Sequence, residues 1–411
     1  MKQNQSTKPQ KRERVRTRTG DTDLAFSIVV LILLGLGIVM MFSASYAIAI
    51  NEGKAGYFYA LRQVTFAGIG LVMMFIMSHV DYHIFQKKGF PLIIYGGAVL
   101  LLILVLFIGT DLDTGCTRWL NLGFTTFQPS ELAKFAIVIL FSYLIDQNFD
   151  KMQQLFAGTV VYLLLLGLII GLLLLEPHLS CSILIAVIGV ALVFVGGAKW
   201  RNIGIITIIG VILAGLVIMY LMNTKGIGYF ERRITTWRHP FDSEDVDGTW
   251  QTRQSLIAIG SGGLLGLGLG ESRQKYLYLP ESENDFVFSI VCEELGLFGA
   301  IMVILLFVML VMQGFHIASH CKDRFGMLVA IGFTLQIGLQ AFINIGVVSG
   351  FLPNTGISLP FFSYGGTALV MQLVEMGIVL NISRSRQPVR KEKVRPISQE
   401  PEIEPIFLKD A

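Results

Sequence analysis

Long apolar segments separated by short polar segments dominate the chain. Ten apolar runs follow one another, at residues 24–46, 57–79, 91–110, 131–147, 155–175, 179–197, 202–222, 286–315, 326–350 and 363–383. A helix of about 20 apolar residues crosses the ~30 Å hydrocarbon core of a bilayer. The pattern therefore predicts an all-α fold, a polytopic membrane helical bundle of ten transmembrane helices.

The polar segments divide this bundle from its tails. We expect a basic cytoplasmic tail at 1–20, a ten-span membrane domain at 21–385 and a second cytoplasmic tail at 386–411. A large extracytoplasmic loop at 223–284 lies between predicted spans 7 and 8. The basic N-terminal segment is not followed by a short apolar stretch with a small-residue cleavage site, so the first apolar run is predicted to be a retained span.

Lysine and arginine lie in alternate loops, and this bias predicts the orientation. One set of short loops holds Lys87, Lys88, Lys151, Lys199, Arg201, Lys322 and Arg324, whereas the other set holds only Lys54 and Arg118. Cytoplasmic loops carry the excess of positive charge in membrane proteins. We therefore expect a multi-pass protein of the cytoplasmic membrane with both termini in the cytoplasm.

Composition excludes several classes of protein. Only 15% of residues are charged and 53% are hydrophobic, whereas a soluble domain carries about 25% charged residues. The net charge of +3 reflects basic tails, which suit membrane topology and anionic lipids rather than nucleic acid. The four cysteines form no CxxC pair and predict no disulfide framework.

The long loops all fall on the predicted outer side, at 111–127, 223–284 and 351–362. Function concentrates on loops that a rigid scaffold holds, so we expect an extracytoplasmic working face, where ATP is not available. The glycine-rich run at 260–270 lacks the spacing of a phosphate-binding loop. A tight re-entrant or interfacial turn is the simpler interpretation, and we expect no nucleotide or organic cofactor.

Three polar groups could carry chemistry. Glu281, Glu283 and Asp285 precede an apolar run, and partial burial would raise the pKa of Asp285 toward that of a general base. A solvated acidic loop is the alternative. Arg118 beside an aromatic residue suits an anionic lipid head. Two prolines in 353–367 indicate a broken helix that lines a cavity or is buried in protein.

Glu131 and Lys134 stand three residues apart at a predicted helix start, so they can pair on one face. This pair has two interpretations. It is either a structural ion pair at the helix entrance or part of a site in which Lys134 contacts the substrate.

The sequence resembles the SEDS family (shape, elongation, division and sporulation), which includes FtsW, RodA and SpoVE. The similarity covers residues 20–385 and rests on GCTRWLNLG, QPSELAK, the block from 254 to 296, and NIGVVSGFLPNTGISLPFFSYGG. Many members have Pro-Asp-(Leu/Phe)-Gly where this chain has Pro177-His178-Leu179-Ser180. This variant is more similar to the FtsW/SpoVE branch than to RodA.

The resemblance implies a peptidoglycan glycosyltransferase that polymerises lipid II and releases undecaprenyl pyrophosphate. Asp285 matches the essential aspartate of the family and would act as base on the 4-hydroxyl of the acceptor sugar, in a transfer with inversion. A divalent cation, Mg²⁺ or Mn²⁺, could assist, with Asp285 or Glu281 as ligands. The substrate-binding residues expected from the family motifs and from the need for positive charge at the pyrophosphate are Arg118, Lys134, Glu131, Glu281, Arg273, Lys275, Arg253, Ser363, Tyr364, Gly365 and Gly366.

The implied partners are lipid II, a class B penicillin-binding protein transpeptidase and other divisome membrane proteins, at the division septum or in related wall synthesis. The alternative function is a flippase or transporter of lipid-linked precursors. Its polar path would use Arg62, Lys134, Gln336, Gln340, Asn344 and Glu375. No inverted repeat of the kind typical of transporters is visible in the sequence. A scaffold that only positions an enzyme would not need a carboxylate at the membrane surface.

Overall fold

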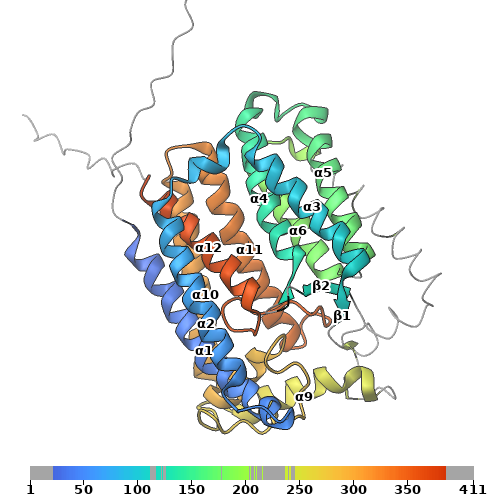
Figure 1. The fold of residues 1–411 in the computed structure, drawn as a ribbon, viewed down its shortest axis with the longest axis vertical. Helices are drawn as coiled ribbons and strands as arrows, with labels where there is room; N and C mark the ends of the chain where they lie inside the picture. Colours follow the sequence, from blue (N-terminus) through green and yellow to red (C-terminus); the bar gives the residue numbers. More distant parts are fainter. Residues whose placement is uncertain are drawn as a thin grey trace, which may run out of the picture.

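The computed structural model describes residues 22–111, 117–121, 126–176, 178–202 and 246–385, with residue 123 and isolated residues between 204 and 241. The predicted tails, most of the predicted span at 202–222 and most of residues 223–245 in the predicted loop therefore lie outside the described residues. The described chain is a bundle of long helices with a small sheet and loops at one end (Figure 1).

The described helices follow the apolar runs, except that α9 lies within the predicted 223–284 loop. They are α1 (Leu24–Asn51), α2 (Phe58–His79), α3 (Phe90–Ile108), α4 (Pro129–Gln147), α5 (Val161–Leu175), α6 (Leu179–Val195), α9 (Val246–Gly262), α10 (Val287–Ser319), α11 (Arg324–Val348) and α12 (Gly366–Ser383). Short helical turns lie at η1 (Tyr82–Gln86), η2 (Phe149–Lys151) and η3 (Phe156–Val160).

Seven helices in the described part of the chain are long and apolar enough to cross a membrane: α1, α2, α3, α5 with η3, α10, α11 and α12. The helices α4 and α6 pack within the same bundle. A polytopic helical membrane fold is thus confirmed, while the count of ten spans stays a prediction.

The structure differs from the predicted all-helical fold in one place. Three short strands, β1 (Thr110–Asp111), β2 (Thr117–Asn121) and β3 (Thr126–Phe127), form an antiparallel sheet in the order β1-β2-β3 between α3 and α4. Thr110 pairs with Trp119, and Leu120 pairs with Phe127. Pairing the strands satisfies backbone groups that a loose loop would leave open, and it holds β2 at the end of the bundle.

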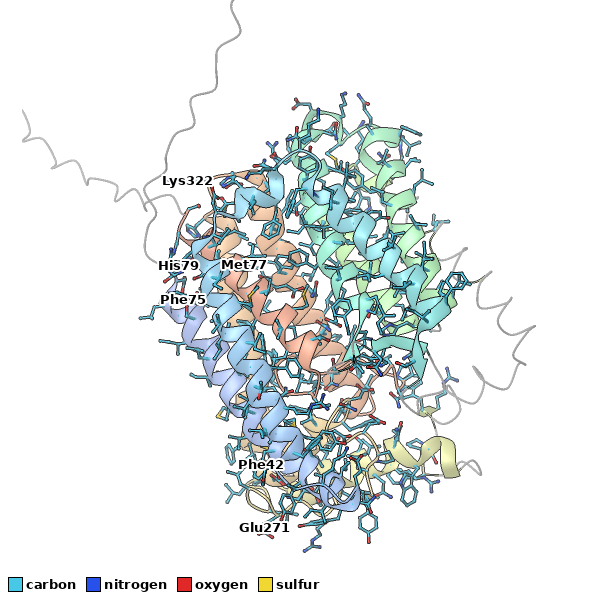
Figure 2. All side chains as sticks on the ribbon, viewed as in Figure 1. Phe42, Phe75, Met77, His79, Glu271 and Lys322 are labelled. Atoms are coloured by element: carbon cyan, nitrogen blue, oxygen red, sulfur yellow. The ribbon has the colours of Figure 1, made fainter. Side chains whose placement is uncertain are left out.

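The helix ends show which loops share a side. The backbone N–H of Asp23, which caps α1, donates to Ser383 Oγ at the end of α12 over 3.0 Å. The loops after α1, α3 and α11 and the segment before α10 meet at the opposite end, where they line a common cavity. Figure 2 shows the same separation, with His79 and Lys322 at one end and Glu271 at the other.

The helix α10 is broken at Gly296, which has a φ of 65°. Because a break exposes backbone groups, the glycine-rich segment supplies partners on both sides. Leu267 N donates to Glu293 O over 3.0 Å, and Leu297 N donates to Gly263 O over 2.9 Å. A Cβ on Gly296 would lie 2.3 Å from Gly266 N, so this junction requires glycine. The 260–270 run is a structural turn that fills the gap in α10.

Two glutamates just before the break are buried and accept hydrogen bonds from this turn. Glu294 forms a 3.0 Å ion pair with Lys275 and accepts a 2.6 Å hydrogen bond from Ser43 Oγ of α1. Glu293 accepts from the Ser272 hydroxyl and, over 3.1 Å, from the backbone N–H of Arg273. Carboxylates at this depth are costly without partners, and the network ties α1, α10 and the turn together.

Candidate active site

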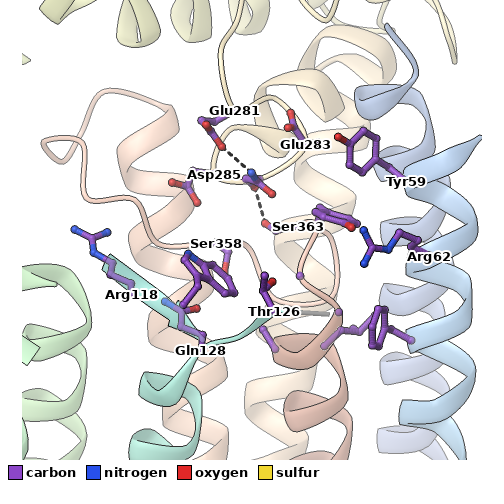
Figure 3. A pocket seen from close by; sticks show the side chains of 18 of the residues that line it. Tyr59, Arg62, Arg118, Thr126, Gln128, Glu281, Glu283, Asp285, Ser358 and Ser363 are labelled. Atoms are coloured by element: carbon purple, nitrogen blue, oxygen red, sulfur yellow. Dashed lines mark hydrogen bonds between the residues drawn. The ribbon is translucent and has the colours of Figure 1, made fainter. Parts of the chain in front are cut away.

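A cavity of about 570 Å³ opens among the loops at the end of the bundle that carries the small sheet. Its lining combines side chains from α2, β2, the segment before α10 and the 356–366 segment before α12. Figure 3 shows Glu281, Glu283 and Asp285 on one wall, with Arg118 and Arg62 on opposite sides of the cavity. A concave polar site of this size can hold a substrate head group.

Asp285 lies two residues before the start of α10 and points into this cavity (Figure 3). Burial and, secondarily, the neighbouring Glu281 carboxylate raise the pKa of Asp285 to about 7, while the Arg118 guanidinium opposes the shift. A carboxyl group with that pKa is divided between acid and base near neutral pH, as a general base requires.

Glu281 and Glu283 stand beside Asp285, and the three residues together form the acidic wall of the cavity. Burial, with the like charges nearby, raises the pKa of Glu283 to about 7. Glu281 accepts a 2.6 Å hydrogen bond from Asn284 Nδ2. Glu281 (φ 58°) and Phe361 (φ 67°) both line the cavity and both hold a left-handed backbone. Such strained residues persist only where the surroundings fix them, commonly at functional sites.

Seven of the predicted site residues line the cavity together. They are Asp285, Glu281, Arg118, Ser363, Tyr364, Gly365 and Gly366. They come from three segments separated by up to 248 positions, and the bundle brings them to one end.

Five other predicted site residues lie outside the described lining of this cavity. Lys134 is 2% exposed and forms a 2.8 Å ion pair with Glu131, so its contacts match those of a structural pair at the start of α4. Lys275 is the partner of Glu294. Arg273 is exposed, and Arg253 donates to the carbonyl of Phe241 over 2.8 Å.

Several lining residues were not among the predicted site residues. Tyr59 and Arg62 lie on the side opposite Arg118 (Figure 3), and Lys54 also lines the cavity. Lys54 is held by Glu52 over 2.5 Å and by Tyr59 over 3.2 Å. The outer-loop position of Lys54 was visible in the sequence, but its side chain could not be assigned to the same site as Asp285 without the packing of α2.

His178 also lines the cavity and is the residue just before α6. Burial lowers the pKa of His178 to about 3, and the nearby positive charge of Arg118 adds to this shift, so the imidazole is neutral. Nearby Glu176 has a pKa that burial raises to about 8 against the opposing charge of Arg118. The position where many family members carry aspartate therefore presents an uncharged hydrogen-bonding group here.

A preformed metal centre is not evident in the part of the chain that the structure describes. Within those residues, no group of three or more His, Cys, Asp or Glu side chains could hold a metal ion. Glu281 and Asp285 could offer carboxylate oxygens, but a protein-only site for Mg²⁺ would require more ligands.

Comparison with known proteins gives a consistent assignment. A relative from Geobacter sp. (strain M18), "Probable peptidoglycan glycosyltransferase FtsW", is 38% identical over 346 residues, covering 84% of this chain and 92% of the relative. Stage V sporulation protein E of Bacillus subtilis is 35% identical, covering 84% of this chain and 92% of that protein.

Solved structures agree. A chain from a structure described as "Structural coordination of polymerization and crosslinking by a peptidoglycan synthase complex" superposes with a TM-score of 0.70 at 26% identity, covering 88% of this chain and 98% of that one. The rod shape determining protein RodA of Thermus thermophilus gives a TM-score of 0.63 at 27% identity, covering 89% and 98% of the two chains. The FtsW/RodA/SpoVE family model, described as "Cell cycle protein", matches residues 24–388, and this chain belongs to that family.

Proposed function

We propose that this protein is a peptidoglycan glycosyltransferase that polymerises lipid II at the outer face of the cytoplasmic membrane, in cell division or related septal wall synthesis. The observation that carries the proposal is the Asp285 carboxyl group, which faces the cavity with a pKa of about 7. Relatives named as peptidoglycan glycosyltransferases support the same reaction class.

The reaction is a single displacement. The 4-hydroxyl oxygen of the acceptor sugar attacks the anomeric carbon of the donor, and the bond from that carbon to the pyrophosphate oxygen breaks. Asp285 accepts the hydroxyl proton, and undecaprenyl pyrophosphate leaves with the electron pair. Attack from the face opposite the leaving group inverts the anomeric centre. General-base assistance of this kind contributes about 10²–10⁴-fold to a rate.

The leaving pyrophosphate needs positive charge close to the site of bond cleavage. Arg118 faces Asp285 across the cavity (Figure 3), and its planar guanidinium suits phosphate oxygens. Arg62 supplies positive charge on the other side of the cavity (Figure 3), whereas the charge of Lys54 is paired with Glu52. We assign Arg118 to the pyrophosphate and leave the other side for a second lipid-linked chain.

A divalent cation would bind with the substrate rather than before it. Mg²⁺ commonly keeps several waters and takes one or two carboxylates together with substrate phosphates. Glu281 and Asp285 could provide those carboxylates, and the pyrophosphate would provide the remaining oxygens. No step of the displacement described above depends on this ion.

The orientation follows from the lysine and arginine bias, with both tails cytoplasmic, ten spans and the cavity outside. A cysteine placed at Asp247 should react with an impermeant reagent on intact cells, and one placed at Lys322 should not. The reverse labelling would overturn this topology. We also propose a class B penicillin-binding protein and other divisome membrane proteins as partners, and enrichment at the septum.

The deciding experiment is polymerisation of labelled lipid II by the purified full-length protein, with and without its transpeptidase partner. Asp285→Asn keeps the size of the side chain but cannot accept the proton, so we expect the rate to fall by about 10²–10⁴-fold. The matched control is Glu271→Gln, which removes an exposed carboxylate from the same region. Near-normal polymerisation by Asp285→Asn would exclude the base assignment, and lipid II translocation without polymerisation would favour the flippase.

A further inference from the structure

The Asn344 side chain joins two segments that line the cavity, the acidic segment that ends at Asp285 and the 356–363 segment. Its side chain lies on α11 and is 1% exposed. Its Nδ2 donates to the carbonyl of Asp285 over 2.7 Å and to the carbonyl of Ile357 over 2.7 Å. Both N–H groups of one amide are therefore used, one on the acidic segment and one on the 356–363 segment.

The neighbouring carbonyls of the acidic segment are held in the same way. Ser363 Oγ donates to Asn284 O over 2.6 Å, and the backbone N–H of Tyr364 donates to Glu283 O over 2.8 Å. Figure 3 shows Ser363 directly below the acidic wall. Three consecutive carbonyls are thus bound, and that of Asp285 is the one held by a side chain from the rigid interior of a helix.

The two joined segments meet at the Asp285 carboxylate itself. A Cβ built on Gly356 would lie 3.3 Å from Asp285 Oδ2, so the 356–363 segment passes directly beside the carboxyl group. The position of the Asp285 carboxyl group therefore depends on the spacing between these two segments. The Asn344 amide fixes that spacing by its two hydrogen bonds.

We propose that Asn344 is a positioning residue for Asp285, acting through the backbone of Asp285 and the adjoining 356–363 segment rather than by contact with the substrate. The inference rests on the proposed function, because it assigns a role relative to the general base. A base whose backbone carbonyl is held by the Asn344 amide, next to a segment that the same amide holds, meets the acceptor hydroxyl at a constant distance and angle. Small displacements of a catalytic group lower the rate of the chemical step strongly.

A purely structural role is the competing explanation, and the chain offers a matched control. Asn381 on α12 is also buried and also joins two segments, at the opposite end of the bundle. Its Nδ2 donates to Ser78 O over 2.8 Å, and its Oδ1 accepts from Tyr82 N over 3.1 Å. Asn381→Ala should lower thermal stability as Asn344→Ala does but should leave the active site unchanged.

The experiment compares Asn344→Ala, Asn344→Asp and Asn381→Ala in full-length protein with the transpeptidase partner. We measure kcat and KM for lipid II, the pH profile of kcat and thermal unfolding. Asn344→Ala should lower kcat by about 10–100-fold, while KM stays within about twofold. Asn381→Ala should leave kcat per folded molecule and the pH profile within about twofold of the unaltered protein.

Asn344→Asp preserves the volume of the side chain and serves where the alanine variant does not fold. The new carboxyl group adds to the charges that already act on Asp285, namely Glu281 and Arg118. When ionised, it repels the Asp285 carboxylate, so the acidic limb of the profile should move to higher pH. Because proximity alone produces this shift, the positioning role is tested by kcat on the plateau above the limb, where the ionised carboxylate of the Asn344→Asp variant can donate to neither carbonyl and kcat should stay low.

The outcomes separate the two proposals. An inactive unaltered protein, or an active Asp285→Asn variant, refutes the proposed function and this inference with it. If Asp285→Asn is inactive but both Asn344 variants match Asn381→Ala in kcat on the plateau above the limb, only the positioning role fails. A rise in KM with unchanged kcat would also refute it, because that result indicates substrate binding.

Discussion

The pH profile of polymerisation gives a direct test of the acidic wall. Asp285 accepts a proton only in its ionised form, and its pKa is raised to about 7 chiefly by burial. Activity should therefore be lost as pH falls through about 7. For a group with that pKa, roughly one tenth is ionised at pH 6 and roughly nine tenths at pH 8, so kcat should rise about tenfold between them.

Two substitutions should move the acidic limb of the pH profile, the range over which kcat rises with pH, in opposite directions. Glu281→Gln removes a negative charge that raises the pKa of Asp285, so the limb should move to lower pH. The glutamine retains an oxygen that can accept from Asn284 Nδ2. Arg118→Gln removes a positive charge that lowers the same pKa, so the limb should move to higher pH. If the pKa of Asp285 changes by about one, the rate at a fixed pH on the acidic limb changes about tenfold.

The assay is the initial rate of labelled lipid II polymerisation from pH 5 to pH 9 at constant ionic strength. Glu271→Gln serves as the control, because it neutralises an exposed carboxylate that does not line the described cavity. Its profile should match that of the unaltered protein. A rate independent of pH between 6 and 8, or shifts of equal sign for Glu281→Gln and Arg118→Gln, would refute the assignment of the limb to Asp285.

Three further predictions concern the surrounding structure. Gly296→Ala should lower the free energy of unfolding by about 1–3 kcal/mol because its Cβ would overlap the glycine-rich turn; Gly260→Ala, which has open space around it, is the control in a thermal unfolding assay. Lys134→Glu alone should inactivate the protein by leaving like charges in a buried pair, and adding Glu131→Lys should restore polymerisation if the pair is structural. Weak lipid II binding by Lys134→Gln protein that folds normally would indicate substrate contact instead. Mn²⁺ should bind measurably only when a pyrophosphate-bearing lipid is present, and binding to the protein alone would contradict that expectation.

The membrane fold could be predicted from the sequence because each span carries its own signal. Backbone groups in lipid must be satisfied within the segment, so a long apolar run has few alternatives to a helix. The runs at 24–46 and 326–350 correspond closely to α1 and α11. The strands of the small sheet were missed because β1 and β3 are only two residues long and depend on pairing across the loop.

The candidate site could be predicted only in part. Asp285 was identifiable because a carboxylate directly before an apolar run is costly, and Arg118 was identifiable from its outer loop. Lys134 and Lys275 carried equally suitable charges, but the fold directs each to a buried glutamate. Charge type is local information, whereas the partner of a charge depends on which helices pack together.

The sequence by itself thus determined the membrane class, the helical segments and the acidic residue at the start of α10, because periodicity and burial cost act over short stretches of chain. The tertiary structure decided which distant segments share the cavity. It brought Arg62 to the side of the cavity opposite Arg118 and Lys54 to the same lining. It placed the glycine-rich turn in the break of α10, and it joined the Asn344 amide to the backbone of Asp285. These contacts join residues that are remote along the chain, so their geometry exists only once the helices have packed.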